Sequence, residues 1–171
     1  MCSSYRVVDA ISMTGNGSPP GLSVNRWKAW LSPKRDTARA MSEESREELI
    51  RRNFDRWNAG EREIDPQLAH HDVVFHSGLT NATYHGHDGV RRWMAEIDDQ
   101  FQDWHSYIDE FRDAPEERLL ALGAVHLRGR ASGVEFDQPM AWLFTFAGGK
   151  VIELRTIPDH AQALEAAGLS E

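Results

Sequence analysis

Histidines are the residues of this sequence whose type and spacing could do chemistry, because imidazole serves both as a metal ligand and as a base near neutral pH. The step His85-Gly86-His87 could offer two imidazoles to a metal ion, with His76 as a third, but no suitably placed carboxylate completes the set. We therefore predict no metal site and no cofactor. We expect instead that these histidines lie in loops and at helix ends without binding a metal ion. Five of the eight histidines lie close together in the chain: His70, His71, His76, His85 and His87.

Other chemistries are excluded by what the sequence lacks. It has no Gly-rich phosphate loop, no Gly-x-Ser-x-Gly elbow and no paired-carboxylate motif. Its single cysteine, Cys2, rules out an intramolecular disulfide and a cysteine-only metal site. The net charge of −8 argues against nucleic acid as a partner. No apolar run reaches the roughly 18 residues of a membrane span, and no secretory signal is evident. We expect a cytoplasmic protein with no membrane partner.

The charge divides the chain into two parts. Residues 1–41 hold six Lys and Arg against two Asp, which is +4 and leaves −12 for the rest. The run from Asn16 to Gly21 breaks regular structure, and no apolar periodicity surrounds it. We predict a poorly ordered basic arm over residues 1–41 and one folded domain over residues 42–171. An alternative is a basic tail that binds an acidic partner or a membrane surface through Trp27, Trp30 and Leu31.

Regular patterns of apolar residues begin after residue 41. A capping box at Ser45–Glu48 and the Asn58-Ala59-Gly60 stop predict an amphipathic helix. Asp65-Pro66 predicts a short second helix that ends at Ala69, and a third helix begins at Asp88. Asp159 is expected to cap a last helix, stopped at Gly168. Five strands are predicted, at residues 73–75, 104–111, 119–127, 136–146 and 151–157.

Helices followed by an antiparallel meander indicate an α+β fold. In the segment 140–146, alternation sends Met140, Trp142, Phe144 and Phe146 to one strand face. Val125 and Leu127 share one face of the neighbouring strand, with His126 and Arg128 on the other. A curved sheet closed by helices that carry Trp57 and Trp93 gives a cone with an apolar interior. The alternative is a fully packed core.

The order of elements, together with several local strings, resembles the nuclear transport factor 2-like superfamily, and within it the SnoaL-like branch that includes polyketide cyclases and ketosteroid isomerase relatives. The resemblance covers residues 45–169, about three quarters of the chain. The matching strings are Phe54–Gly60, Leu68–His76, Gly86–Val90, Ser132–Glu135 and Phe144–Ile152.

The resemblance implies a cone-shaped fold of helices packed on a curved, mainly antiparallel sheet, with a short C-terminal helix and a pocket inside. It also implies a homodimer formed through the convex sheet face, where we expect His126, Arg128, Glu153 and Arg155. It does not imply one activity, because members of the superfamily include isomerases, cyclases, hydrolases, dehydratases and binders without catalysis.

The family register places His76 where ketosteroid isomerases hold their general base, pointing into the cone beside Trp57 and Trp142. Strand alternation places His76 on the same face as Val74. The family register also places Asn53 and Trp142 at the two oxyanion positions, and neither is the strong acidic donor that a dienolate needs. Steroid isomerisation is therefore disfavoured, and so is the epoxide-hydrolase variant, because no Asp accompanies Arg128 and Arg130 on the strands.

The predicted function is binding of a small, largely apolar molecule in the cone, with proton transfer of the cyclase, isomerase or hydrolase type at His76. The alternative is a ligand-binding or dimeric accessory domain without catalysis. Two further catalytic candidates are Tyr84, at the pocket mouth, and Asp159, a rim acid or only a helix cap. The predicted ligand-binding residues are Phe54, Trp57, Val74, Trp93, Ile97, Val125, Leu127, Met140, Trp142, Phe144 and Thr156.

Overall fold

The computed structural model describes the backbone of residues 35–170 and the side chains of residues 46–170. The chain divides into two compact units, Met1–Arg39 and Ala40–Glu171, and the second contains every strand that the structure describes. The first helix, α1, spans Arg35–Asn58 and so begins well before the capping box at Ser45. The predictions for the arm that fall on residues 1–34 lie outside the described residues.

Helix α1 contributes an apolar face to the domain. Ile50 is fully buried, and Leu49, Phe54 and Trp57 pack against the same core. The helix ends as predicted at Asn58, where the Ala59 amide donates to the Asp55 carbonyl at 2.9 Å. Gly60 follows with a φ of +89°, a conformation that residues with a Cβ rarely adopt.

The predicted short helix at residues 65–69 is wrong, because the chain makes a single turn there before it enters the sheet. Asp65 Oδ1 accepts the Gln67 amide at 2.8 Å, as a helix cap would. The Leu68 carbonyl, however, accepts the Val151 amide at 2.8 Å. Because the Leu68 carbonyl is bonded to Val151, the chain continues as a strand from Ala69 and does not form a further helical turn.

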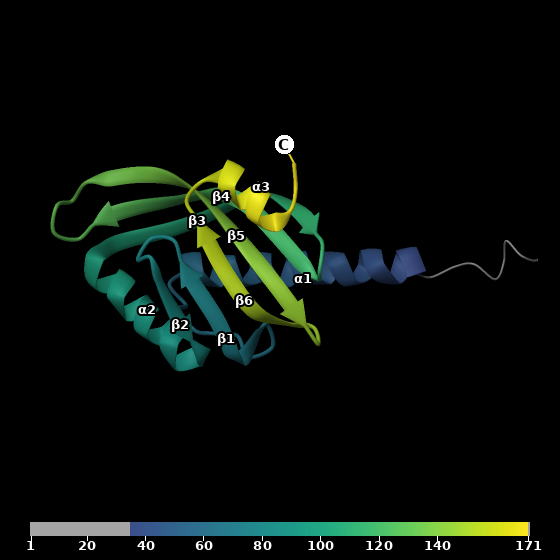
Figure 1. Cartoon of the computed structure of the whole chain (residues 1–171). Coiled ribbons are helices and arrows are strands. Elements are labelled where there is room, and N and C mark those ends of the chain that lie inside the picture. The colour runs from purple at the N-terminus through teal and green to yellow at the C-terminus, as the bar shows by residue number, and fades with distance from the viewer. Residues whose placement is uncertain (1–34, 171) are drawn as a thin grey trace, which may run out of the picture. The chain divides into compact units, whose positions relative to one another are not determined.

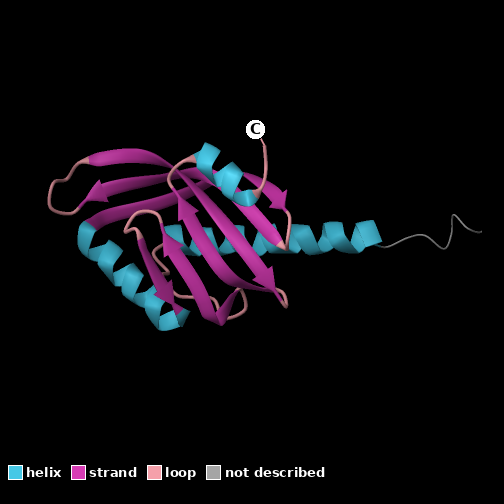
Figure 2. Cartoon of the chain, viewed as in Figure 1, coloured by secondary structure: helices cyan, strands magenta, loops and turns pink. Residues whose placement is uncertain are grey.

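Six strands form one sheet, in the order β2-β1-β6-β5-β4-β3 (Figures 1 and 2). All neighbours are antiparallel except β1 and β6, which run parallel. All five predicted strands are present and longer than expected, whereas β2 lies in a segment for which we predicted no strand. The strands are β1 (Ala69–Ser77), β2 (Ala82–His85), β3 (Phe101–Ala114), β4 (Arg118–Gly129), β5 (Glu135–Ala147) and β6 (Lys150–Ile157).

The interior face of the sheet carries the main core, and α1 and α2 (Gly86–Gln100) cover it. Helix α2 buries Trp93 and Ile97 on its predicted apolar face. Within the described residues, no helix is both long and apolar enough to cross a membrane. The predicted alternation of β4 and β5 is confirmed, since the core contains Val125, Leu127, Met140, Trp142, Phe144 and Phe146.

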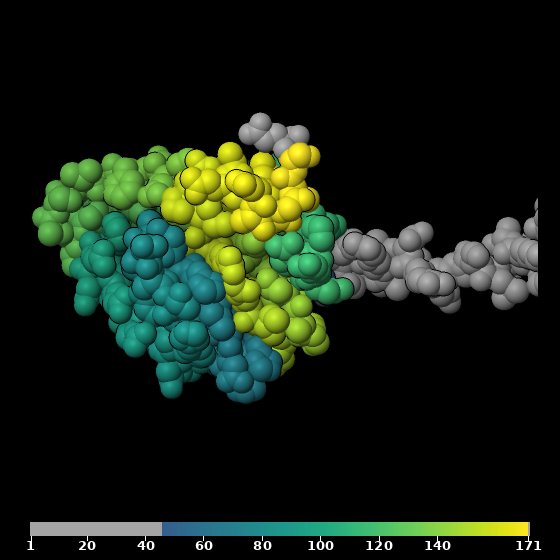
Figure 3. All heavy atoms as spheres, viewed as in Figure 1, coloured from purple at the N-terminus to yellow at the C-terminus, as the bar shows by residue number. Residues whose placement is uncertain are grey.

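The opposite, outer face of the sheet carries a second, smaller core. Helix α3 (His160–Ala167) packs on it through Ala163, Leu164 and Ala167, against Leu120, Leu122, Ala141 and Leu143 of β4 and β5. In Figure 1, α3 lies in front of the sheet and α1 behind it. Figure 3 shows that α3 (yellow) covers only part of the outer face, so other strand residues of this face remain visible. The expected α+β fold is confirmed.

Candidate functional site

A cavity of about 140 Å³ lies between α1, α2 and the interior face of the sheet. Its walls are mainly apolar and aromatic. The aromatic residues that line it come from both helices and from β1, β3 and β5: Phe54, Trp57, Phe75, Trp93, Trp104, Trp142 and Phe144.

Three tryptophans form the most crowded wall. Trp57 stacks on Trp93 at 5.7 Å between ring centroids, and Trp104 meets both of them edge-on at 6.3 and 5.8 Å. The Trp93 indole donates to Ser77 Oγ at 3.1 Å, and the Trp104 indole donates to Ser106 Oγ at 2.9 Å. The Trp57 Nε1 is buried and has no hydrogen-bond partner among the described residues. Two of the three rings are thus fixed by hydrogen bonds, and the third carries an unpaired donor.

Ser106 is itself anchored to the end of α1. The Asn58 side chain donates from Nδ2 to the Ser106 carbonyl at 2.8 Å and accepts the Ser106 amide on Oδ1, also at 2.8 Å. A side-chain amide can complete a backbone pair in this way because it carries both a donor and an acceptor. The contact joins the C-terminal end of α1 to β3 beside the pocket.

The ionisable residues that line the pocket are all acidic: Glu61, Glu63 and Asp65 follow directly after α1. Arg56 partly balances them, with its Nε 3.0 Å from Glu61 Oε2 and its Nη1 3.9 Å from Asp65 Oδ2. Among the ion-paired carboxylates of the described residues, Asp65 is the most enclosed, with a side chain 16% exposed. These carboxylates disfavour an anionic group at this side of the pocket.

A neighbouring arginine lies over one of the indoles. The Arg62 guanidinium sits 5.0 Å from the centroid of the Trp57 ring and forms an ion pair with Asp98. Burial lowers the pKa of Arg62, and the positive charge of Arg130 lowers it further. Arg62 therefore covers one face of Trp57, and its charge is directed to Asp98 rather than to the pocket.

Six of the eleven predicted ligand-binding residues line this pocket, and their binding role stays a prediction. Four others are buried in the same core without lining it: Ile97, Val125, Leu127 and Met140. Val74 does not line it, because Val73 and Phe75 of the same strand point inward in its place. The six are Phe54, Trp57, Trp93, Trp142, Phe144 and Thr156.

The prediction missed the acidic residues after α1 and several wall residues. Asn53, which the family register placed at an oxyanion position, lines the pocket, as Trp142 does. Trp104 lies in β3, three residues after its start, and could have been found from its alternation with Ser106. Glu61, Glu63 and Asp65 lie outside regular elements, so no periodicity marks them.

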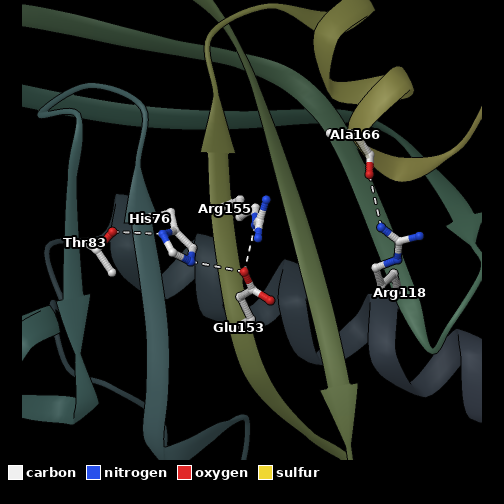
Figure 4. A network of polar contacts seen from close by, with 6 residues as sticks. All are labelled: His76, Thr83, Arg118, Glu153, Arg155 and Ala166. Carbon is white, nitrogen blue, oxygen red and sulfur yellow. Dashed lines mark hydrogen bonds and ion pairs between the residues drawn. The ribbon is translucent and has the colours of Figure 1, made fainter.

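The expected orientation of His76, into the interior beside Trp57 and Trp142, is wrong. Its Nδ1 lies 2.9 Å from Thr83 Oγ1 and its Nε2 lies 3.1 Å from Glu153 Oε1, on the outer face of the sheet (Figure 4). In β1 the buried positions are Val73, Phe75 and Ser77, so the side chain between the last two faces the other way. A catalytic role for His76 stays a prediction, but His76 does not line this pocket.

Tyr84 and Asp159 also lie outside the pocket wall. The Tyr84 phenol is buried and donates to Glu96 Oε2 at 2.5 Å. Burial raises its pKa, and the Glu96 carboxylate raises it further, so the phenol is a donor and not a base at neutral pH. Asp159 Oδ1 accepts the Gln162 amide at 2.8 Å and caps α3, which was the favoured interpretation of that residue.

The three histidines whose spacing was considered for a metal site do not lie together. Among the described residues, one group of three places its potential metal ligands together: His70, His71 and Asp72, with one donor atom from each within 4.8 Å of the others. His76, His85 and His87 form no such group in this part of the chain.

Comparison with known proteins identifies the domain. The sequence model of the SnoaL-like domain matches residues 50–154, more than half of the chain. No curated protein matches the chain.

Solved structures resemble the domain at low sequence identity, which supports the fold alone. An NTF2-like protein of unknown function from Burkholderia pseudomallei K96243 has a TM-score of 0.61 and 17% identity, over 71% of this chain and 96% of that one. A putative SnoaL-like polyketide cyclase from Jannaschia sp. CCS1 has a TM-score of 0.58 and 20% identity, over 74% and 93%. A protein from Catenulispora acidiphila DSM 44928 with a ketosteroid isomerase-like fold, in complex with trimethylamine, has a TM-score of 0.51 and 19% identity, over 67% and 90%.

Proposed function

Because the chain belongs to the SnoaL-like domain family, we propose that its folded domain binds a small, largely apolar molecule in the pocket between α1, α2 and the sheet. The observation that carries the proposal is the cavity of about 140 Å³, which the aromatic side chains around it leave unfilled. An apolar cavity of about 150 Å³ is large enough to bind benzene. The ligand is therefore a molecule with about the volume of a single ring.

The charge of the pocket narrows the class of ligand. Its ionisable lining residues are Glu61, Glu63 and Asp65, and no Lys, Arg or His lines it within the described residues. A carboxylate ligand would be repelled there, whereas a neutral or cationic one would not. The structural neighbour from Catenulispora was crystallised with trimethylamine, a small ligand, which supports including amines among the probes.

Proton transfer on the same ligand is a second candidate function. Asp65 lines the cavity, is largely enclosed, and keeps its Oδ2 3.9 Å from Arg56. A carboxylate at the wall of an apolar pocket is the kind of group that can take a proton from a bound molecule. Asp65→Asn removes the base and keeps the shape, so it would abolish any turnover while leaving binding in place.

Binding is tested by titrating the full chain with benzyl alcohol, benzylamine and benzoate, followed by ligand-observed NMR. We expect the first two to bind and benzoate to bind at least tenfold more weakly. Val73→Phe narrows the cavity and should weaken binding at least tenfold. Val74→Phe, on the outer face of the same strand, is the matched control and should leave binding unchanged. Equal effects of the two variants, or no binding of any probe, would refute the proposal.

We also propose that the domain forms a homodimer through the outer face of the sheet. Beyond the part that α3 covers, this face presents His76, Glu153 and Arg155 on adjacent strands. Light scattering should then give twice the chain mass of 19.4 kDa, and Arg155→Glu should lower it. A mass of a single chain at micromolar concentration would exclude the dimer.

A further inference from the structure

We propose that His70, His71 and Asp72 form a binding site for a divalent transition-metal ion of the Zn²⁺ type. The proposal is independent of the ligand pocket. It starts from the finding that one donor atom from each of these three consecutive residues lies within 4.8 Å of the others.

An irregularity in β1 explains how consecutive residues can converge. In a regular strand, His70 and His71 would point to opposite faces of the sheet. Here Ala69 pairs with Val151 and Val74 pairs with Glu153, so β1 advances five residues while β6 advances two. The extra residues bulge out of the ladder, and a bulge redirects the side chains it carries. The bulge therefore brings the two imidazoles to one side.

Within the bulge, the side chains of the three proposed ligands already lie close to one another. The rings of His70 and His71 lie 4.2 Å apart between centroids, and His71 Nε2 lies 2.8 Å from Asp72 Oδ2. Ligands bound tetrahedrally at about 2.0–2.1 Å are about 3.3–3.4 Å apart. The His71 and Asp72 side chains are 74% and 76% exposed, so they can rotate to that spacing.

The donor set selects the class of ion. Two imidazoles and one carboxylate suit Zn²⁺, Ni²⁺, Co²⁺ or Cu²⁺, whereas Mg²⁺ and Ca²⁺ prefer oxygen ligands. Three protein ligands leave a fourth position for water, as in open zinc sites. The net charge of −8 favours a cation over an anion at the surface.

The bulge also adjoins the pocket. Ala69 and Val73, which flank the three ligands in sequence, both line the cavity. A metal ion bound by His70, His71 and Asp72 would restrict the conformation of the backbone between these two wall residues.

The test is competition for Zn²⁺ between the full chain and a chromophoric chelator, repeated with Ni²⁺ and with Mg²⁺. We expect one Zn²⁺ per chain, competition by Ni²⁺ and none by Mg²⁺. His71→Ala and Asp72→Asn should each weaken Zn²⁺ binding about tenfold or more. Both side chains are exposed, so both variants should melt at the wild-type temperature in EDTA.

His126→Ala is the matched control, because His126 forms another exposed imidazole–carboxylate pair, 2.9 Å from Asp137 Oδ1, with no third ligand among the described residues. It should leave Zn²⁺ binding unchanged. Three outcomes would overturn the proposal: no saturable Zn²⁺ binding, wild-type affinity in both His71→Ala and Asp72→Asn, or an equal loss in His126→Ala.

Discussion

Phe75 and His76 are consecutive in β1, yet their side chains lie on opposite faces of the sheet. The Phe75 ring meets Trp93 in the interior at 4.7 Å, edge to face. The His76 imidazole contacts Glu153 and Thr83 on the outer face (Figure 4). The residue of β1 that faces the cavity here is therefore the apolar Phe75. The sheet itself separates the polar His76 side chain from the cavity.

This arrangement predicts a large effect for one of the two neighbouring substitutions and a small effect for the other. Phe75→Ala should lower the free energy of unfolding by about 3–5 kcal/mol and alter probe binding, because it enlarges the cavity. His76→Ala should cost about 1 kcal/mol or less and leave probe binding unchanged, since its contacts are partly exposed. Urea denaturation and the benzyl alcohol titration measure both. Loss of probe binding in His76→Ala would place His76 functionally in the pocket after all.

Much of the fold could be predicted because its apolar patterns are long. The period of α2 and the alternation in β4 and β5 each run over several residues, and the structure has the expected faces. The short elements failed. Asp65-Pro66 is equally typical of a helix start and of a turn, and only the distant pairing of Leu68 with Val151 decides between them. Strand β2, at Ala82–His85, is too short to show a period.

The pocket was harder to predict, because alternation says which side chains share a face but not which face is inside. Val74 and His76 do share a face, as the pattern indicated, but Val73 and Phe75, which are both apolar, take the interior. The bulge before Val74 shifts the register in a way that no local pattern reveals. The same bulge explains why the sequence did not indicate that the rings of His70 and His71 lie side by side.

The two hydrogen bonds between Asn58 and the Ser106 backbone predict a stability effect. Asn58→Ala leaves the Ser106 amide and carbonyl without these partners, and should lower the free energy of unfolding by about 1–3 kcal/mol. Gln102→Ala, an exposed amide in the same strand, is the control and should change it by no more than about 0.5 kcal/mol. Equal urea midpoints for the two variants would contradict the anchoring role.

The raised pKa of Tyr84 predicts a loss of stability at alkaline pH. In the unfolded chain the phenol ionises near pH 10, whereas in the folded protein burial and Glu96 keep it protonated to higher pH. Its contribution is fully present below about pH 10 and falls as the pH rises above that value, by up to about 1.4 kcal/mol per pH unit. Urea denaturation at pH 9 to 11 should show this slope in the wild type and a shallower one in Tyr84→Phe. Parallel slopes would contradict it.

Among the described glycines, Gly123 is the position where we expect an added methyl group to lower the free energy of unfolding most. A Cβ at this position would lie 1.8 Å from the Tyr107 carbonyl oxygen of β3. No rotamer change can relieve this clash, because the backbone fixes the position of the Cβ and the oxygen belongs to the backbone. The β3–β4 ladder shifts register nearby, between Ile108 and Glu110, so the strands approach closely at this point.

Gly123→Ala should therefore lower the free energy of unfolding by about 3 kcal/mol or more, because the paired strands must separate. Gly133→Ala is the informative comparison. Gly133 has a φ of +63° but nothing within 4 Å of an added Cβ, so it carries only the conformational cost of about 1–2 kcal/mol. Urea denaturation of the two variants separates close approach from backbone strain. A smaller loss at Gly123 than at Gly133 would mean that β3 can move away from β4 without disturbing the core between them.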